Sequence, residues 1–426
     1  MATMSAIKTV LAYMDSAVES FTSQSNMIDK VSVITPNPGE FQNAGNFVVR
    51  PVQPHAADIS GWDLTGLETG TIEEAYIAGM GTPSNAFVSL RVDDLRDIRR
   101  VKKQGKADGE KRASVLNKAI VDSIRLTGTM GYRTNVTSGF DAISLAQAGM
   151  NKRQVPTSDR YIALNDTHLQ AYGKDLAGRQ TLNGQPSETF QKGVLYPRVA
   201  DFNVMSSSSI SLLAGGADPA TTVTGNQSFA PQGGSVTAAG NIVTNVDYRT
   251  ATIPVAASAS YNVGDLVTFA NGGVTVKAVG RDDKTVTDEA MTFRIVSKPS
   301  GASIEVWPKP IANDDPALST LEKTYSNINT RILNAATVNR LNIDASTQPS
   351  IFWQKDSIEV IAGEVPIEKL GEWGGMKVAK ESLGNDLTMY MLYDANIATL
   401  QARWRCFVWY GVNNARPGDN GLLIKY

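Results

Sequence analysis

The chain has 426 residues, of which 42% are hydrophobic and 19% are charged, and its formal net charge is −2 at pH 7. This length allows two or three domains with sizeable cores. The nearly balanced charge excludes a general electrostatic attraction to nucleic acid or to anionic membranes. The single cysteine, Cys406, excludes an internal disulfide framework and is typical of assembly in a reducing cytosol.

Residues 1–30 are predicted to contain a weakly amphipathic helix. The segment carries Asp15 and Glu19 and lacks the continuous apolar stretch of a secretory signal. No stretch of the chain approaches the roughly 18 apolar residues of a membrane span, so we expect no membrane partner. The helix prediction depends on apolar residues at helical spacing, namely Ile7, Val10, Leu11, Met14 and Val18.

Residues 31–90 are expected to be extended. Pro36, Pro38, Pro51 and Pro54 each exclude a helix interior, and glycines recur from residue 61 to residue 81. A stretch of this length is either a long loop or a two-stranded arm that relies on a neighbour for burial.

A charged helix is predicted from about Asp93 to Leu126, with a possible break at Gly105 and Gly109. Between Arg91 and Arg125 there are eleven basic and six acidic residues. This excess could mark a nucleic-acid contact or a solvated helix face. No aromatic residue is interleaved for base stacking, which favours the solvated face.

Short strands and helices are predicted in residues 130–215 and again after the strand-dense segment that begins at residue 219. Asn165 is a plausible N-cap for a helix that follows the strand at residues 160–164. Ser319 and Glu322 form a capping-box pattern, and an amphipathic helix is predicted from there to Ala335. The last hundred residues return to strands, at residues 351–353, 358–362, 389–393 and 405–410.

Residues 219 to about 312 differ from the rest in being dense in predicted strands. In one hairpin Val267 and Phe269 alternate with polar residues up to a turn at Asn271-Gly272, and Val274 and Val276 resume the pattern. A second hairpin has its turn at residues 298–301, between Phe293 and Ile295 on one side and Ile304 and Val306 on the other. We therefore expect a small β-domain inserted in an α/β host.

The sequence shows no catalytic constellation. The two histidines, His55 and His168, have no neighbours of the kind that a metal site requires, and Cys406 lies in an apolar strand, as packing cysteines do. The chain lacks a phosphate-binding loop or a complete dinucleotide fingerprint. Adjacent carboxylates such as Asp282 and Asp283 diverge in a strand or a helix and so make poor catalytic pairs. We expect no enzyme activity, no cofactor and no metal.

Three groups of residues, taken together, resemble a known family. They are Gly61-Trp-Asp-Leu-Thr65 with Asp93-Asp-Leu-Arg-Asp97; Trp307-Pro-Lys-Pro310 with Asp314-Asp315 and Asn327-Ile-Asn-Thr330; and Trp409-Tyr-Gly-Val-Asn413 with Ala415-Arg-Pro417. Their order and spacing resemble the major coat proteins of short-tailed lambdoid bacteriophages of the Salmonella type. The resemblance runs from about residue 30 to residue 418. It implies an α+β chain with the Hong Kong 97 shell fold and an inserted small β-barrel, the I-domain.

The resemblance also implies a domain organisation. In it, residues 1–46 form an N-terminal arm, 47–90 an extended E-loop that lies across a neighbouring subunit, and 91–129 the spine helix of the peripheral domain. The axial domain is expected at 130–218 and 342–395, the I-domain at 219–341, and the last strands of the peripheral domain at 396–426. Gly105, Gly109, Gly128 and Gly131 are either hinge points or ordinary turn residues.

The function implied is that of a major capsid protein. Such a protein forms hexamers and pentamers with copies of itself, is guided by a scaffolding protein into a precursor shell that expands on packaging, and meets a portal protein. Double-stranded DNA inside would be touched weakly and without specificity, in a virion assembled in the host cytoplasm. The alternatives are a cargo-enclosing shell or head-accessory protein of the same fold, and a polysaccharide-active enzyme using carboxylates such as Asp93 or Glu359. The candidate assembly residues are Trp62, Asp63, Asp93, Asp94, Arg96, Asp247, Arg249, Trp409, Tyr410 and Arg416.

One segment departs from the family pattern. The I-domain loop of the family carries acidic residues that pair across capsomers, whereas residues 231–245 here have no charge. A salt bridge between capsomers is therefore not expected from this loop. Asp247 and Arg249, which come directly after it, are expected to pair locally on the barrel.

Overall fold

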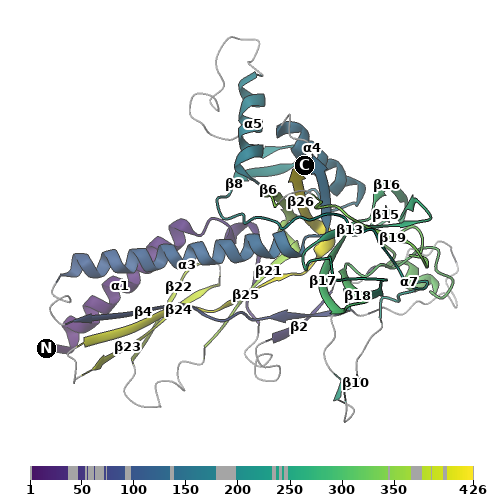
Figure 1. The fold of residues 1–426 in the computed structure, drawn as a ribbon. Coiled ribbons are helices and arrows are strands. Elements are labelled where there is room, and N and C mark those ends of the chain that lie inside the picture. The colour runs from purple at the N-terminus through teal and green to yellow at the C-terminus, as the bar shows by residue number, and fades with distance from the viewer. Residues whose placement is uncertain are drawn as a thin grey trace. The chain divides into compact units, whose positions relative to one another are not determined.

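A computed structural model describes most of the chain, in two compact units (Figure 1). The first unit comprises Met1–Val48, Ala78–Val121 and Ile358–Asn413, and the second comprises Val49–Ile77, Asp122–Ser357 and Asn414–Tyr426. No helix among the described residues is both long enough and apolar enough to cross a membrane. The described residues are 2–36, 47–52, 55, 62, 72, 74–91, 97–134, 139–178, 198–232, 237–238, 242–243, 248–343, 346–365, 377–384, 386–396 and 401–425.

The first unit combines two long helices with two sheets. The helices are α1 (Ala2–Gln24) and most of α3 (Ile98–Thr127), and the 3-10 turn η1 (Ile28–Lys30) follows α1. The larger sheet has the order β22 (Lys377–Ser382), β23 (Thr388–Asn396), β24 (Gln401–Val408), β4 (Ser84–Arg91). The smaller sheet has the order β1 (Ser32–Ile34), β21 (Ile358–Ala362), β25 (Tyr410–Asn414).

The core of this unit lies between the helices and the larger sheet. Trp404 and Cys406 alternate with exposed Arg405 along β24, as the period of two in a strand requires. The ring of Tyr13 on α1 lies 5.3 Å from that of Trp404. Burial raises the pKa of the Cys406 thiol to about 12, so the cysteine is a packing residue, as predicted.

The two helices pack together where α3 carries glycines. A Cβ atom on Gly109 would lie 2.2 Å from the carbonyl oxygen of Ala17, and one on Gly105 would lie 2.3 Å from the hydroxyl of Ser16. The hydroxyl of Tyr13 donates a 2.5 Å hydrogen bond to Asp108 beside this contact. The predicted break at these glycines is therefore wrong, because close packing against α1 outweighs their low helix propensity.

The second unit contains a six-stranded sheet with helices α4 (Gly139–Lys152) and α5 (Asp166–Gly178). The strand order is β5 (Met130–Thr134), β26 (Asn420–Lys425), β20 (Ser350–Gln354), β6 (Arg160–Leu164), β8 (Phe202–Ser206), β7 (Arg198–Val199). Asn165 caps α5, because its side chain accepts a 2.7 Å bond from the amide of His168; this N-cap prediction is confirmed. Two 3-10 turns, η3 (Lys355–Ser357) and η4 (Pro417–Asp419), complete the helical segments of this region.

The predicted insert lies in this second unit and has its own core. Its main sheet has the order β12 (Ala251–Pro254), β18 (Ser303–Trp307), β17 (Phe293–Ser300), β13 (Leu266–Asn271), β19 (Thr337–Arg340), β9 (Thr221–Thr222), with β14 (Val274–Thr275) beside β13. The amide of Thr224 donates to Pro254 and that of Ala256 donates to Thr222, both at 2.9 Å. These bonds join the two edge strands, so the sheet curls back on itself around apolar side chains such as Phe269 and Phe293.

Two small strand pairs complete the insert. One is β15 (Lys277–Val279) with β16 (Val286–Ala290), and the other is β10 (Thr237–Ala238) with β11 (Ile242–Val243). The second pair belongs to the uncharged segment 231–245, most of which lies outside the described residues. In Figure 1, β10 lies apart from β17 and β18.

Both predicted hairpins are confirmed, with shifted turns. In the first, Asn271 pairs with Val274, and the turn residues are Gly272 and Gly273 at φ of +55° and +88°. A two-residue turn with positive φ at both positions matches the twist of the strands and favours glycine. In the second, Ser300 pairs with Ser303, so β17 continues through most of the predicted turn.

The helix predicted from Ser319 to Ala335 is wrong beyond its first turn. The capping box is present, but α7 covers only Thr320–Lys323. Ile328 and Ile332 are buried in the insert core from irregular chain. The side chain of Asn327 accepts a 3.0 Å bond from the amide of Ile311, so side-chain bonds to the backbone replace helical ones here. Apolar spacing of about four residues does not distinguish these arrangements.

Two strands that precede β4 in the chain pair with each other. The strands β2 (Phe47–Pro51) and β3 (Ala75–Gly79) form a two-stranded sheet. For residues 31–90 the sequence left two alternatives, a long loop or a two-stranded arm, and this strand pair agrees with the arm. Such a pair is marginal in water without further packing.

Glycine-to-alanine substitutions test the helix contact. We expect Gly109→Ala to destabilise the protein by about 1–3 kcal/mol, because the overpacking against α1 exceeds the gain in helix propensity of about 1 kcal/mol. Gly173 on α5 is the matched control, since a Cβ there meets nothing within 4 Å. Gly173→Ala should therefore stabilise the protein. Urea unfolding measures both changes, and an increase in stability from both would contradict the close contact.

Candidate assembly site

The end of α3 is capped by a buried arginine of the insert. Arg294 on β17 is fully buried, and its Nε donates a 2.8 Å bond to the carbonyl of Leu126. Its Nη2 donates to the carbonyl of Arg125. The last carbonyls of a helix lack intrahelical donors, and a positive charge is favourable beside them. Burial lowers the pKa of Arg294 to about 9.

Further polar contacts join the insert to the residues after α3. The hydroxyl of Thr292 donates to the carbonyl of Thr129 at 2.6 Å and accepts from Arg153 at 2.9 Å. Gly131 on β5 leaves room for Leu266, which would lie 2.7 Å from a Cβ atom at that position. The insert therefore packs closely against β5 of the six-stranded sheet and against Thr129, which precedes β5.

The base of the insert holds a buried ion pair. Arg340 and Asp265 lie 2.6 Å apart, and both side chains are 2% exposed. The side-chain amide of Asn342 donates to Asp265 and to the carbonyl of Ala214, each at 2.8 Å. These contacts bring together the two places where the chain enters and leaves the insert. Removing one partner of such a pair leaves an uncompensated charge and typically costs about 3–5 kcal/mol.

Arg249, a predicted assembly residue, is used within its own chain. Its guanidinium donates to the carbonyls of Asn414 and Ala415, at 2.5 Å and 3.0 Å. It also lies 4.0 Å from the ring centre of Tyr76 and 4.5 Å from that of Trp307. Arg249 thereby ties the insert to the C-terminal segment and to β3. Asp247, its expected local partner, lies outside the described residues.

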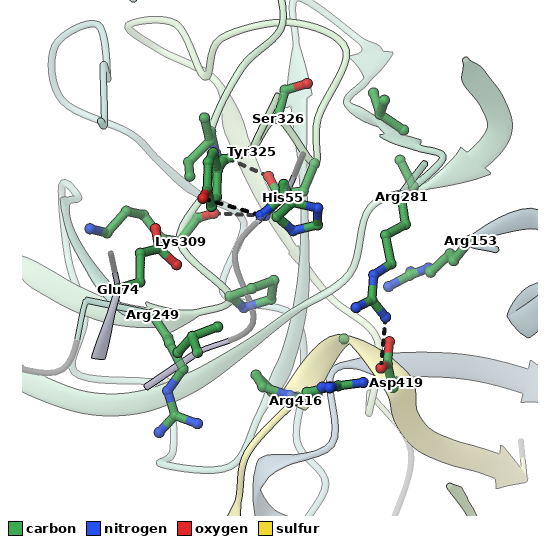
Figure 2. Close-up of a pocket in the computed structure, with 18 of the residues that line it drawn as sticks. His55, Glu74, Arg153, Arg249, Arg281, Lys309, Tyr325, Ser326, Arg416 and Asp419 are labelled. Atoms are coloured by element: carbon green, nitrogen blue, oxygen red, sulfur yellow. Dashed lines mark hydrogen bonds and ion pairs between the residues drawn. The ribbon is translucent and has the colours of Figure 1, made fainter. Parts of the chain in front are cut away.

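Tyr325 and His55 tie the β2–β3 arm to the insert. The hydroxyl of Tyr325 donates a 3.0 Å bond to the carbonyl of Ile72 and accepts a 3.2 Å bond from the amide of His55. The two rings meet edge to face at 4.9 Å, as Figure 2 shows. Burial, and then the nearby charges of Lys284 and Arg281, lower the pKa of His55 to about 4.

The other predicted residues are distributed over different environments. The indole of Trp409 donates to the carbonyl of Gly81 at 2.9 Å, and Tyr410 is buried beside it in the first unit. Burial raises the pKa of Tyr410 to about 12. Trp62, in the connection between β2 and β3, is fully exposed. Arg416 lines a cavity of the second unit.

Four more predicted residues, Asp63, Asp93, Asp94 and Arg96, lie outside the described residues. Asp97 completes the motif that three of them belong to, and it caps α3, because its side chain accepts a 3.0 Å bond from the amide of Arg99. The motif therefore ends directly before α3, and Asp97 has a local structural role as the cap of that helix.

The sequence reasoning missed the buried charges of the insert. Arg294 lies between Phe293 and Ile295, and the backbone partner of Arg340 is the apolar Val267. Arginine is almost never fully buried unless it is paired, so an arginine inside an apolar strand was a usable signal. The partners of Arg294, which are the carbonyls of Arg125 and Leu126 in α3, could not be inferred from the sequence pattern.

The comparisons with known proteins identify the family. A family model described as "P22 coat protein - gene protein 5" matches residues 1–424. The chain belongs to the P22 coat protein family. It is a phage major capsid protein that forms the shell of the head, and its described residues have a mixed α+β fold.

Several solved structures resemble the coat protein at low identity. The capsid protein of cyanophage P-SCSP1u is 11% identical, with a TM-score of 0.45 over 93% of this chain and 86% of that chain. The mature capsid protein of bacteriophage PhiM1 is 9% identical, with a TM-score of 0.42 over 93% and 85%. The head protein of Helicobacter pylori bacteriophage KHP40 is 12% identical, with a TM-score of 0.39 over 92% and 85%. No residue role is transferred from proteins this distant.

Replacing the capping arginine tests the contact with α3. We expect Arg294→Met to destabilise the coat protein by about 1–3 kcal/mol for each buried carbonyl left without a donor. Lys277→Met removes a charge from an exposed position of the insert and should change stability by no more than about 0.5 kcal/mol. Urea unfolding of the monomer measures both. Equal stabilities for the two variants would contradict the capping role.

Acidification tests the environment of His55. Its pKa of about 4 lies below the ordinary 6.5, so between these values the unfolded chain binds a proton that the folded chain excludes. The free energy of unfolding should therefore decrease as the pH falls from about 6.5 to about 4. In His55→Gln this decrease should be smaller, whereas from pH 7 to pH 8 the two proteins should keep a constant difference. Parallel curves over the whole range would contradict the lowered pKa.

Proposed function

We propose that this coat protein forms the hexamers and pentamers of a phage head through its β2–β3 arm, the expected E-loop. The exposed side chain of Trp62 carries the proposal. A fully exposed tryptophan on a segment whose described ends form only a two-stranded sheet leaves a large apolar surface in water. A neighbouring copy of the chain is the partner that would bury it.

The domain organisation expected from the sequence supports this assembly. We assign residues 1–46 to the arm, 47–90 to the E-loop, 91–129 to the spine helix, 130–218 and 342–395 to the axial domain, 219–341 to the I-domain and 396–426 to the last peripheral strands. In this assignment α1 is the helix of the N-terminal arm and α3 is the spine. Their glycine contact would hold arm and spine as one rigid piece during expansion of a precursor shell.

Head-to-tail contacts in such rings close by symmetry. Each contact needs only modest net affinity, because closure makes the shell stable through multivalency. Weak single contacts allow misplaced subunits to dissociate before the shell closes.

The remaining partners follow from the family. We propose that a scaffolding protein guides a precursor shell, that a portal protein occupies one vertex, and that packaged double-stranded DNA meets the inner surface weakly. Assembly in the host cytoplasm agrees with the single reduced cysteine. Membership of a coat protein family supports a structural role without catalysis.

Electron microscopy of the protein expressed with and without its scaffolding protein tests the proposal. Closed, uniform shells are expected with scaffold. A monodisperse monomer that never assembles would count against a shell function of any kind. DNA inside particles from infected cells would separate a phage head from a cargo-enclosing shell.

Replacing the exposed tryptophan tests the proposed contact. We expect Trp62→Ala to leave the melting temperature of the monomer unchanged, because its side chain is exposed, and to abolish or greatly slow shell formation. Val286→Ala, at another exposed apolar position, is the control and should assemble normally. Normal shells from Trp62→Ala, seen by electron microscopy and light scattering, would refute the contact.

A further inference from the structure

A cavity of about 220 Å³ lies in the second unit, beside the insert (Figure 2). Its walls come from the start of the β2–β3 arm, from the insert, from the end of α4 and from the segment around η4. One liquid water occupies about 30 Å³, so the cavity can hold a small polyatomic ion together with water. Residues of two of the sequence motifs line it, namely Pro308, Lys309 and Asn327 of the second group and Ala415, Arg416 and Pro417 of the third.

Positive charge gathers on one side of this cavity. Figure 2 shows Arg153, Arg281 and Arg416 around the carboxylate of Asp419. Arg281 and Asp419 are 3.3 Å apart, and Asp419 is buried. Lys284 lines the same cavity and donates to the carbonyl of Ser326 at 3.3 Å.

Other charged groups of the cavity wall lie away from these arginines. The head group of Lys309 donates to the carbonyls of Ala230 and Pro231 at 3.3 Å and 3.0 Å. Figure 2 shows Arg249 with its guanidinium turned away from the three arginines, and Glu74 on the side of Lys309. Arg153, Arg281 and Arg416 therefore form a group of their own on one side of the cavity.

Arg153 has donors without acceptors. Its side chain is 7% exposed, and its Nη2 donates to Thr292. Its Nε and Nη1 have no hydrogen-bond partner among the described residues. The neighbouring hydroxyl of Tyr132 donates to Glu289 at 3.0 Å. Burying a guanidinium with open donors is costly unless an acceptor is supplied, so this group points to an anion.

The arginines are held in place by a strained local backbone. The side chain of Gln154 accepts bonds from the amides of Asp282 and Asp283, at 2.7 Å and 3.3 Å. This fixes the turn that carries Arg281 and Lys284 next to Arg153. Gln154 and Lys284 both have left-handed backbones, with φ of 59° and 55°. Such backbone strain is typical of functional sites.

We propose that this cavity binds a phosphate-type oxyanion between the guanidinium groups of Arg153, Arg281 and Arg416. A phosphate group carries a charge of about −1.5 to −2 at neutral pH and would supply oxygen acceptors to the open donors of Arg153. Guanidinium forks suit paired oxygen acceptors. Apolar residues such as Val279 and Met291 form other parts of the wall and strengthen the attraction by excluding water.

The titration behaviour of nearby bases agrees with an anion site. Burial lowers the pKa of Lys284 to about 8, and the pKa of His55 lies at about 4 for the reasons given above. A bound dianion would stabilise the charged form of both groups and raise both pKa values.

Calorimetric titration of the purified coat protein with inorganic phosphate, at constant ionic strength, tests the proposal. Saturable binding with one site per chain is expected. Lys284→Met should weaken it about tenfold, because it removes a positive charge that lines the same cavity. Asp419→Asn should tighten it, because a competing negative charge is removed. Lys277→Met removes a charge from the insert outside the cavity and should leave binding unchanged.

Distinct outcomes would overturn the site. Heats that do not saturate, or equal heats from chloride, would show that no phosphate site exists. Equal affinities for wild type, Lys284→Met and Lys277→Met would place any binding elsewhere, and this comparison suffices if Asp419→Asn fails to fold. Displacement of bound phosphate by a short single-stranded oligonucleotide would identify a nucleic-acid phosphate as the source of the same chemistry, whereas its absence would identify the free ion.

Discussion

Arg294 brings a buried positive charge to the last carbonyls of α3. A helix of this length ends with carbonyl groups that need donors, and the guanidinium needs acceptors once it leaves water. The Nε and Nη2 of Arg294 meet the carbonyls of Leu126 and Arg125, whereas its Nη1 has no partner among the described residues. The contact therefore couples the folding of the insert to that of the helix end. Thr292, which bonds to the carbonyl of Thr129, and the buried Asp265–Arg340 pair are further polar contacts where the insert meets the rest of the chain. The insert is thus attached to the end of α3 by buried polar contacts.

Steric constraints specify the remaining contacts of α3 and of the strand that follows it. Gly105 and Gly109 let the backbone of α1 approach the helix, and Gly131 lets Leu266 approach β5. At each position a methyl group would have to occupy space that is already filled. The hydrogen bonds from Arg294 at the end of α3 and the close packing of α1 along α3 are thus independent constraints. Together they suit a subunit whose pieces must stay rigid while a shell forms.

Local patterns in the sequence predicted the local structure well. Alternating apolar residues gave both hairpins of the insert, and Asn165 and Ser319 gave their caps, because these signals act over a few residues. The helix after Ser319 failed since residues of an irregular segment can also be buried at every fourth position. The break at Gly105 failed because only tertiary packing reveals why a glycine is needed. The cavity arginines come from distant segments, so no local pattern joins them, and roles between subunits lie beyond a single chain altogether.

The most direct test of this account is a reconstruction of the assembled shell in which every subunit of the asymmetric unit is refined independently. We expect the guanidinium of Arg294 to lie on the carbonyls of Arg125 and Leu126 in all of them, because a buried guanidinium without these acceptors would be costly. Differences between subunits should then be confined to other segments, such as the β10–β11 hairpin. Subunits in which the insert has moved off the end of α3, with the arginine in solvent, would contradict the account.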